Sequence, residues 1–463
     1  MKRTAPFIAL ALFAPLCMSE GVSLSVSVDL AQQRAPAAAF SDERLFAVWQ
    51  DARDGGKLFG QAYDADSSLL WEENGRPLVS AAGNQGTPAV APDGSGGFFL
   101  VWLSMPNLQR DLYAQRFNKE GKPLWETVVV AEHEHPKSDH RIAPDGKGGL
   151  YIVWEDWRNA NLDIYGQRVS ASGEILWEAN GTALSSSPSN QYDPSVSADE
   201  NGCVVVWWDV PEIEAWQVYA QRMSPEGKPL WGEGGTRACL NPSGQSSGAV
   251  AADGAGGAFV FWVDHRNEVS PQGDALMNLD IYVQQFDPSG KRLLSEEGRA
   301  LCEAPGTQIE VAALPDGNGG AYAVWTDLRD HYEDIYAQRV LPDGSAAWQA
   351  NGAPVCVEGG RQRSPRIAPA ADGFWIVWYD YRRELEEQTF QDVYMQRMRA
   401  DGTTARQEGG LPIAVRPGQR IEMSVCAGKS GAAAFWAEQP DEFSGMDIRG
   451  WVSQPRSAAQ NKE

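Results

Sequence analysis

The residues that most resemble a catalytic acid–base set are an aspartate and an arginine two positions apart, followed by a second aspartate. In one such set, Asp156 and Arg158 are followed by Asp163. Two further sets are Asp327, Arg329 and Asp334, and Asp380, Arg382 and Asp392. Residues two apart on a strand share a face and the next strand returns beside them, so we expect each arginine to bridge its two aspartates. Where the arginine is missing after Asp209, Gln217 replaces the second aspartate. This joint loss favours a structural lock over catalysis.

Three of the five histidines form a second group that could do chemistry. His133, His135 and His140 lie close together in the sequence, with Glu134 and Asp139 between them. His-x-His on an extended backbone points both rings the same way, which suits a metal ion. A polar loop between two repeats is the preferred explanation of the same residues. We therefore predict no cofactor, and keep these histidines as a candidate site for a divalent cation.

Both groups belong to a repeat that runs along most of the chain. Each copy has an apolar segment ending in Val-Trp or Phe-Trp, then x-Asp-x-Arg, Asp-Ile-Tyr-Ala-Gln-Arg and a glycine turn with Leu-Trp. The marker tryptophans are Trp49, Trp102, Trp154, Trp207, Trp262, Trp325, Trp378 and Trp436. Each copy predicts four short antiparallel strands, here called a to d. The sequence therefore predicts an all-β, eight-bladed β-propeller, with seven blades as the alternative if one copy is displaced.

The two ends of the repeat region predict how the ring closes. The eighth copy stops after its third strand, at Asp447 to Val452, while residues 22–28 match the pattern of strand d. We expect this N-terminal strand to complete the last blade, which leaves no unpaired edge there. The predicted organisation is a signal peptide over residues 1–19, a propeller over 22–454 and a polar tail over 455–463.

The first residues have the pattern of a secretory signal. Lys2 and Arg3 precede an apolar run from Ala5 to Leu16, which is too short to span a bilayer. No other segment approaches that length, so we expect an exported protein without a transmembrane segment, located in the periplasm, outside the cell or at its surface. A lipid anchor at Cys17 is disfavoured, because Leu16 is not the small residue that such signals carry.

The net charge of the chain narrows the classes of partner that it can bind. A net charge of −23 argues against a nucleic-acid-binding surface, which needs a basic stripe.

The cysteines after the signal are Cys203, Cys239, Cys302, Cys356 and Cys426. Three of them occupy the same place in successive copies, too far apart for a disulfide. We expect them to be small, buried hydrophobic residues.

Residues that recur in every copy are expected to serve packing. Burial of each marker tryptophan removes about 150–250 Å² of surface from water. A glutamine recurs just before strand a, at Gln33, Gln85, Gln191, Gln245, Gln308, Gln362 and Gln419. We expect these glutamines to cap backbone groups near the entrance of the axial channel, with a polar collar around that entrance as the alternative.

Function is therefore expected where the copies differ. The a–b and c–d turns are short and glycine-rich, whereas the d–a and b–c loops of the other face diverge. Long b–c loops are predicted at residues 265–279, 383–391 and 438–446. The candidate binding residues near this rim are Trp157, Trp208, Trp216, His265, His331, Tyr332, Tyr379 and Tyr381. Such side chains stack on sugars or anchor a protein partner.

The repeated phrase, from Val-Trp-x-Asp-x-Arg to Gly-x-x-Leu-Trp, resembles the repeats of exported bacterial β-propeller proteins. The resemblance covers residues 22–454 and implies the fold, but no defined activity. We predict a non-catalytic scaffold, monomeric or part of an envelope assembly, that binds a protein or glycan through its loop-rich face. The alternative is a sialidase-like hydrolase at the channel mouth. Arg141 and Arg366, each in Arg-Ile-Ala-Pro, loosely resemble the sialidase arginine motif, but no Tyr/Glu pair joins them. Carboxylates clustered beside rim aromatics would favour the enzyme.

Overall fold

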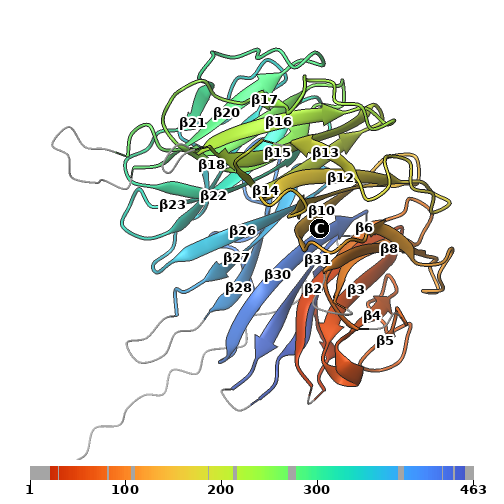
Figure 1. Ribbon diagram of the computed structural model, residues 1–463. Coiled ribbons are helices and arrows are strands. Elements are labelled where there is room, and N and C mark those ends of the chain that lie inside the picture. Colours follow the sequence, from red (N-terminus) through yellow and green to blue (C-terminus); the bar gives the residue numbers. More distant parts are fainter. Residues whose placement is uncertain are drawn as a thin grey trace, which may run out of the picture.

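The strands of the chain form eight four-stranded antiparallel sheets, arranged as the blades of a propeller (Figure 1). The structure is a computed structural model and describes residues 21–29, 31–80, 83–105, 110–185, 187–211, 216–268, 278–383, 391–429, 431–441 and 444–453. The sheets confirm the predicted all-β, eight-bladed fold and exclude the seven-bladed alternative. The predicted signal peptide, Cys17 and the C-terminal tail lie outside the described residues.

Each blade contributes one strand to each of four concentric positions. Strands a are β2 (Gln33–Ser41), β6 (Asn84–Pro92), β10 (Lys137–Pro144), β14 (Asn190–Asp199), β18 (Gln245–Ala252), β22 (Gln308–Pro315), β26 (Gln362–Pro369) and β30 (Gln419–Gly428). Strands b are β3 (Arg44–Asp51), β7 (Phe98–Met105), β11 (Leu150–Asp156), β15 (Gly202–Val210), β19 (Ala258–Asp264), β23 (Ala321–Asp327), β27 (Phe374–Asp380) and β31 (Gly431–Gln439). Strands c are β4 (Lys57–Tyr63), β8 (Asp111–Phe117), β12 (Asp163–Val169), β16 (Gln217–Met223), β20 (Asp280–Phe286), β24 (Asp334–Val340), β28 (Asp392–Met398) and β32 (Asp447–Ser453). Strands d are β5 (Arg76–Pro77), β9 (Val128–Ala131), β13 (Thr182–Ser185), β17 (Thr236–Arg237), β21 (Arg299–Cys302), β25 (Ala353–Cys356), β29 (Leu411–Ala414) and β1 (Gly21–Ser27).

The ring closes by exchange between the two ends of the chain. Strand β1 pairs antiparallel with β32, with Gly21 opposite Ser453, and so supplies strand d of blade 8. The innermost strands pack side by side around the ring, and β2 of blade 1 lies against β30 of blade 8 (Figure 1). The predicted closure by the N-terminal strand is confirmed. A short 3-10 helix, η1 (Arg53–Gly55), follows β3. Within the described ranges, no helix has the length and hydropathy that crossing a membrane requires.

The recurrent Trp-x-Asp-x-Arg phrase is a structural lock. The marker tryptophans are buried, and in blade 3 the indole of Trp154 donates a hydrogen bond of 2.8 Å to Asp156. Arg158 donates hydrogen bonds to the same carboxylate from two side-chain nitrogens, Nε at 3.0 Å and Nη2 at 2.6 Å. The same set forms in blades 1, 5, 6 and 7. The prediction of a lock rather than a catalytic pair agrees with this geometry.

The predicted bridge to the second aspartate is wrong. Besides its contact with Asp156, the guanidinium of Arg158 donates a hydrogen bond to the carbonyl of Asn180 and lies 3.7 Å from the ring centre of Tyr165. Asp163 accepts hydrogen bonds from Asn159 and Asn161 instead. The reason is that one carboxylate occupies the guanidinium fork, and the remaining donor is directed toward the turn before strand d.

The recurrent glutamines cap the backbone. Gln33 and Gln362 are fully buried, and their side-chain amides donate to the carbonyls of Ala31 and Gly360, at 2.6 and 3.2 Å. Because they are buried, these two do not form a collar around the channel. In blade 8, Gln419 is exposed, and the buried place beside it is taken by Arg420.

The recurrent cysteines are buried as predicted, but they are not purely hydrophobic in role, because the sulfur atoms of Cys239, Cys302 and Cys356 each accept a hydrogen bond from the arginine of the lock, at 3.5, 3.3 and 3.2 Å. Cys203, Cys239, Cys302, Cys356 and Cys426 are unpaired, and the first four are buried. Burial raises the pKa of the thiols of Cys203, Cys302 and Cys356 to about 12.

Candidate functional site

Each innermost strand carries a β-bulge at the same point, near the face of the b–c loops. One bulge residue in each blade has a positive φ of 46 to 57°, a conformation that costs energy for any residue with a side chain. These residues are Ala35, Thr87, Asp139, Asp193, Ser247, Glu310, Ser364 and Glu422. A bulge re-aims side chains locally. Several of these residues line an axial cavity of about 610 Å³, together with His140, Arg141 and Arg366.

Three carboxylates from blades 3 and 4 converge at this level of the ring. One oxygen of each of Asp139, Glu155 and Asp193 lies within 4.8 Å of the others. Glu155 accepts hydrogen bonds from the Ser138 hydroxyl at 2.7 Å and from the backbone N–H of Asp193 at 3.1 Å. Burial raises the pKa values of Asp139 and Glu155. Arg141 opposes this shift for Asp139, because it pairs with that carboxylate at 2.6 Å.

A continuous set of aromatic rings begins beside these carboxylates. The Tyr192 and Trp208 rings stack with centroids 4.8 Å apart. Trp208 meets Trp216 edge-on at 5.8 Å, and Trp216 meets His265 edge-on at 5.4 Å. All four residues are partly exposed, although only 12% of the His265 side chain is accessible. We call these four residues the aromatic ladder; it extends from blade 4 to the b–c loop of blade 5.

The ladder and the carboxylates form one polar and aromatic surface. The Trp208 indole donates a hydrogen bond of 2.8 Å to the Asp193 carboxylate, which is itself exposed. His265 is fixed from both sides, by the Ser246 hydroxyl and the Glu268 carboxylate, each at 3.0 Å. These contacts hold the rings in place before any ligand arrives. Such a surface can stack on an apolar ring face and accept hydrogen bonds from hydroxyl groups beside it.

The predicted rim residues are only partly brought together. Trp208, Trp216 and His265 join the ladder, whereas the other predicted residues lie on three different blades. Trp157 lies in the b–c turn of blade 3 and is 40% exposed. His331 and Tyr332 lie in the b–c turn of blade 6, and both are exposed. Tyr379 and Tyr381 belong to blade 7, where the Tyr379 hydroxyl accepts the N–H of Met423 and Arg361 covers the Tyr381 ring.

The three histidines do not converge on a common point. His133 contacts Asp156 at 3.2 Å, and its ring centre lies 6.0 Å from that of His135. His140 is buried, and burial lowers its pKa to about 4. His133 and His135 lie in the connection between β9 and β10, not on the extended strand on which the metal expectation rested. Among the described residues, the ligand atoms that do cluster belong to Asp139, Glu155 and Asp193, without a histidine.

Much of the predicted loop variation lies outside the described residues. This holds for residues 269–277 of the blade 5 loop, 384–390 of the blade 7 loop and 442–443 of the blade 8 loop. Sequence reasoning also missed Tyr192, Asp193 and Glu155. One signal was available: Tyr192 and Asp193 directly follow the recurrent Gln191, and Glu155 directly follows a marker tryptophan. All three positions vary between the copies.

No model of a known protein family matches the chain, and no curated protein matches it. Similar solved structures include a puromycin hydrolase, at 13% identity over 90% of this chain and 60% of that one, with a TM-score of 0.46. Another is the polysaccharide lyase Uly1, at 12% identity over 84% of this chain and 94% of that one, with a TM-score of 0.47. A third is the β-propeller domain of a trilobed protease from Pyrococcus furiosus, at 12% identity over 79% and 95%, with a TM-score of 0.45. The chain spans about 60% of the length of the puromycin hydrolase. Similarity this distant assigns no activity, so the site is interpreted from its own geometry.

Proposed function

We propose that this chain is an exported, non-catalytic scaffold that binds a glycan on the face of its b–c loops. The observation that carries the proposal is the aromatic ladder beside the exposed Asp193 carboxylate. A sugar ring offers an apolar face of C–H groups and a rim of hydroxyl groups. Aromatic rings stack on the first and carboxylates accept hydrogen bonds from the second.

Preorganisation supports this assignment. Trp208 is fixed by Asp193 and His265 by Ser246 and Glu268, so the surface loses little side-chain freedom when a ligand binds. The acidic charge of the chain favours a neutral or weakly charged glycan over an acidic one at this face.

A glycan-active hydrolase is the second candidate, favoured by the three carboxylates that cluster beside the aromatic ladder, the arrangement expected above for an enzyme. Asp139 and Glu155 have raised pKa values beside the aromatic ladder, and a general acid needs a raised pKa. However, both oxygens of Glu155 already accept hydrogen bonds, and Asp139 is paired with Arg141. These contacts suit a group that holds the bulge in place better than one that transfers a proton, so binding without catalysis is the first choice.

A glycan array, followed by titration of the best glycan, tests the proposal. We expect Trp208→Ala and Trp216→Ala each to weaken binding by about 5-fold, since each removes about 1 kcal/mol of stacking. The matched control is Trp157→Ala, because Trp157 is exposed on the same face but lies outside the ladder; it should bind like the wild type. Circular dichroism checks that each variant is folded.

Two results decide between the candidates. Release of reducing ends from the bound glycan by the wild type, lost in Glu155→Gln, would establish the hydrolase. Failure of the wild type to bind any glycan, combined with capture of a protein partner that depends on Trp208 and Trp216, would replace the glycan with a protein ligand.

A further inference from the structure

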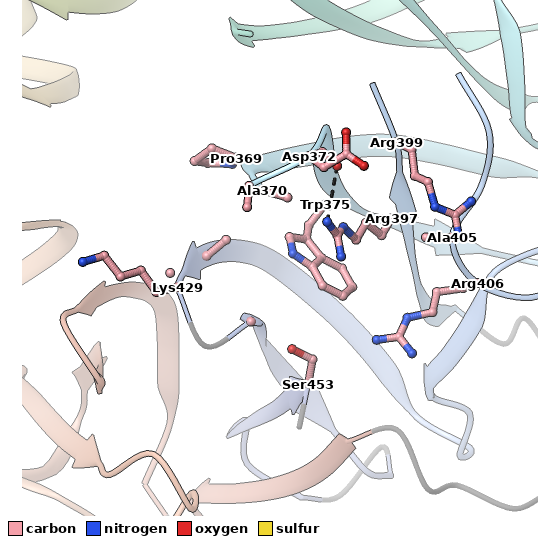
Figure 2. Close-up of a pocket in the computed structure, with 14 residues that line it drawn as sticks. Pro369, Ala370, Asp372, Trp375, Arg397, Arg399, Ala405, Arg406, Lys429 and Ser453 are labelled. Carbon is pink, nitrogen blue, oxygen red and sulfur yellow. Dashed lines mark hydrogen bonds between the residues drawn. The ribbon is translucent and has the colours of Figure 1, made fainter. Parts of the chain in front are cut away.

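A pocket of about 740 Å³ lies between blades 7 and 8, at the opposite ends of the strands from the aromatic ladder (Figure 2). Its wall comes from the a–b turns of both blades, from the strand c end of blade 7 and from Ser453. Four cationic side chains line it: Arg397, Arg399, Arg406 and Lys429. Asp372 is the acidic side chain among its lining residues. A basic pocket stands out in a chain whose net charge is −23.

Arg397 lacks the ion pair that its counterparts make. In blades 2, 3, 4 and 6, the arginine near the end of strand c pairs with an aspartate at the a–b turn. These pairs are Arg116–Asp93 at 2.9 Å, Arg168–Asp145 at 2.7 Å, Arg222–Asp199 at 2.7 Å and Arg339–Asp316 at 2.7 Å. In blade 7, the turn covers residues 370–373, compared with 316–320 in blade 6, and Ala370 takes the place of Asp316.

The consequence is a buried nitrogen without an acceptor. The Nε of Arg397 is buried and has no hydrogen-bond partner among the described residues. Its Nη2 donates to the backbone carbonyl of Asp372 at 3.4 Å, which is a weak contact. A buried charged donor that stays unpaired destabilises a fold, so this group is suited to an acceptor supplied from outside the chain.

In two other blades, a c–d turn of the next blade along the chain fills the equivalent place. Arg339 and Trp348 of blade 6 donate to the carbonyl of Ala400, in the c–d turn of the next blade. Arg168 and Trp177 of blade 3 make the same contacts with Pro225. In blade 8, strand d is β1 from the other end of the chain, so no c–d turn of that blade stands among the described residues.

The residue at the position of Trp348 changes in blade 7. The backbone N–H groups of Trp348 and Arg406 donate to equivalent glutamines, Gln338 and Gln396, each at 2.9 Å, so the two residues correspond. The tryptophan that would face a c–d turn is therefore an arginine beside the blade whose strand d comes from the other end of the chain. Three departures from the repeat coincide at one place: a lost aspartate, this exchanged strand d and a gained arginine.

The arginines gather around one aromatic ring. The guanidinium carbons of Arg397 and Arg406 lie 5.7 and 5.5 Å from the centre of the Trp375 ring. Figure 2 shows both side chains reaching the indole, while Lys429 lies at the far rim and points away from it. We propose that this pocket binds a small organic oxyanion, whose carboxylate, sulfate or phosphate group lies between Arg397 and Arg406. Planar guanidinium groups match the geometry of such anions.

Isothermal titration calorimetry of the whole chain with galacturonate, inorganic sulfate and inorganic phosphate tests the proposal and distinguishes the three anion types. Galactose is the uncharged control ligand. We expect binding of at least one anion and none of galactose. The decisive variant is Ala370→Asp, which gives Arg397 the partner found in the other blades; it should weaken anion binding by about 10-fold or more.

The matched control is Ala255→Asp. Ala255 is exposed in the a–b turn of blade 5, on the same face, so this change adds the same charge far from the pocket. It should leave the affinity within about 2-fold of the wild type, because exposed charges at this distance are screened. The proposal is overturned if no anion binds at millimolar concentration, or if Ala370→Asp and Ala255→Asp weaken binding equally. Neither result depends on whether the aromatic ladder binds a glycan.

Discussion

Blades 6 and 7 have nearly the same sequence phrase, yet the arginine near the end of strand c is paired in one and unpaired at its Nε in the other. Arg339 of blade 6 donates two hydrogen bonds to the buried Asp316 carboxylate. Arg397 of blade 7 faces Ala370 and borders an open pocket. A residue that recurs in every blade is best explained by packing, provided that its whole set of partners recurs too. Where one partner is missing, the same residue becomes available for a ligand.

The largest effect on stability is expected from the Trp–Asp–Arg lock, which blades 6 and 7 share. Asp327→Ala in blade 6 and Asp380→Ala in blade 7 each remove the acceptor of one tryptophan and one arginine. We expect the free energy of unfolding to fall by about 3 kcal/mol or more in both variants, because a buried charge loses its partner. Urea denaturation measures this. A loss below about 1 kcal/mol in either blade would contradict the role of a lock.

The next effect separates the two blades. Arg339→Met leaves the buried Asp316 carboxylate without its ion pair, so the free energy of unfolding should fall by about 1–3 kcal/mol. Arg397→Met removes a group whose Nε has no partner, so the free energy of unfolding should fall by no more than about 0.5 kcal/mol, or rise. The same urea titration, in a buffer without oxyanions, gives both values. Equal losses would show that Arg397 is held by the fold as firmly as Arg339.

A smaller effect comes from the first residue of strand c. Burial, together with the negative charges of Asp330 and Asp327, raises the pKa of Asp334 in blade 6 to about 7. The folded state therefore holds this proton more tightly than the unfolded state, and the stability that it provides below pH 4 is lost as the pH rises to about 7. At pH 8 we expect Asp334→Asn to have a free energy of unfolding higher than that of the wild type by an amount on the order of 1 kcal/mol, and so to unfold at a higher temperature. Near pH 4 the two should unfold at the same temperature.

Blade 7 provides the control for this pH effect. Asp392 occupies the same place and accepts two hydrogen bonds from Arg383, at 2.5 and 2.6 Å. Asp392→Asn should therefore destabilise the chain at pH 8, the opposite of the result for Asp334→Asn. Thermal unfolding followed by circular dichroism at pH 4, 6 and 8 compares the two. If both variants shifted in the same direction at pH 8, the assignment would fail.

The smallest difference is expected between the thiols of the two blades. Cys302 and Cys356 are both buried, and burial raises the pKa of each to about 12. Neither should react with a thiol reagent at pH 8 on the time scale of minutes while the chain is folded, since the thiolate is the reactive form. Both should react in urea. Fast labelling of one blade alone would reveal local opening that the folded structure does not show.

The fold was predictable because each copy of the repeat makes the same local choice of strands, turns and buried tryptophan. Residues 22–28 could be assigned to the last blade, since an unpaired strand edge is unfavourable there. The site was predictable only in part. Trp208, Trp216 and His265 stand out as rim aromatics, but Asp193 acquires its role through a bulge that breaks the alternation of strand a. The arginine lock was half predicted, because spacing along a strand does not say which acceptor fills a guanidinium fork.

The sequence by itself determined the number of blades, the burial of the repeated tryptophans and the closure of the ring, because these follow from a pattern repeated along the chain. The tertiary structure decided which variable residues meet. Asp139, Glu155 and Asp193 come from two blades, and Arg397 and Arg406 border blade 8, whose strand d comes from the other end of the chain. Contacts between blades depend on how neighbouring sheets pack, and the repeat pattern within one blade does not encode them. Both candidate sites arise from such contacts, at opposite ends of the same strands.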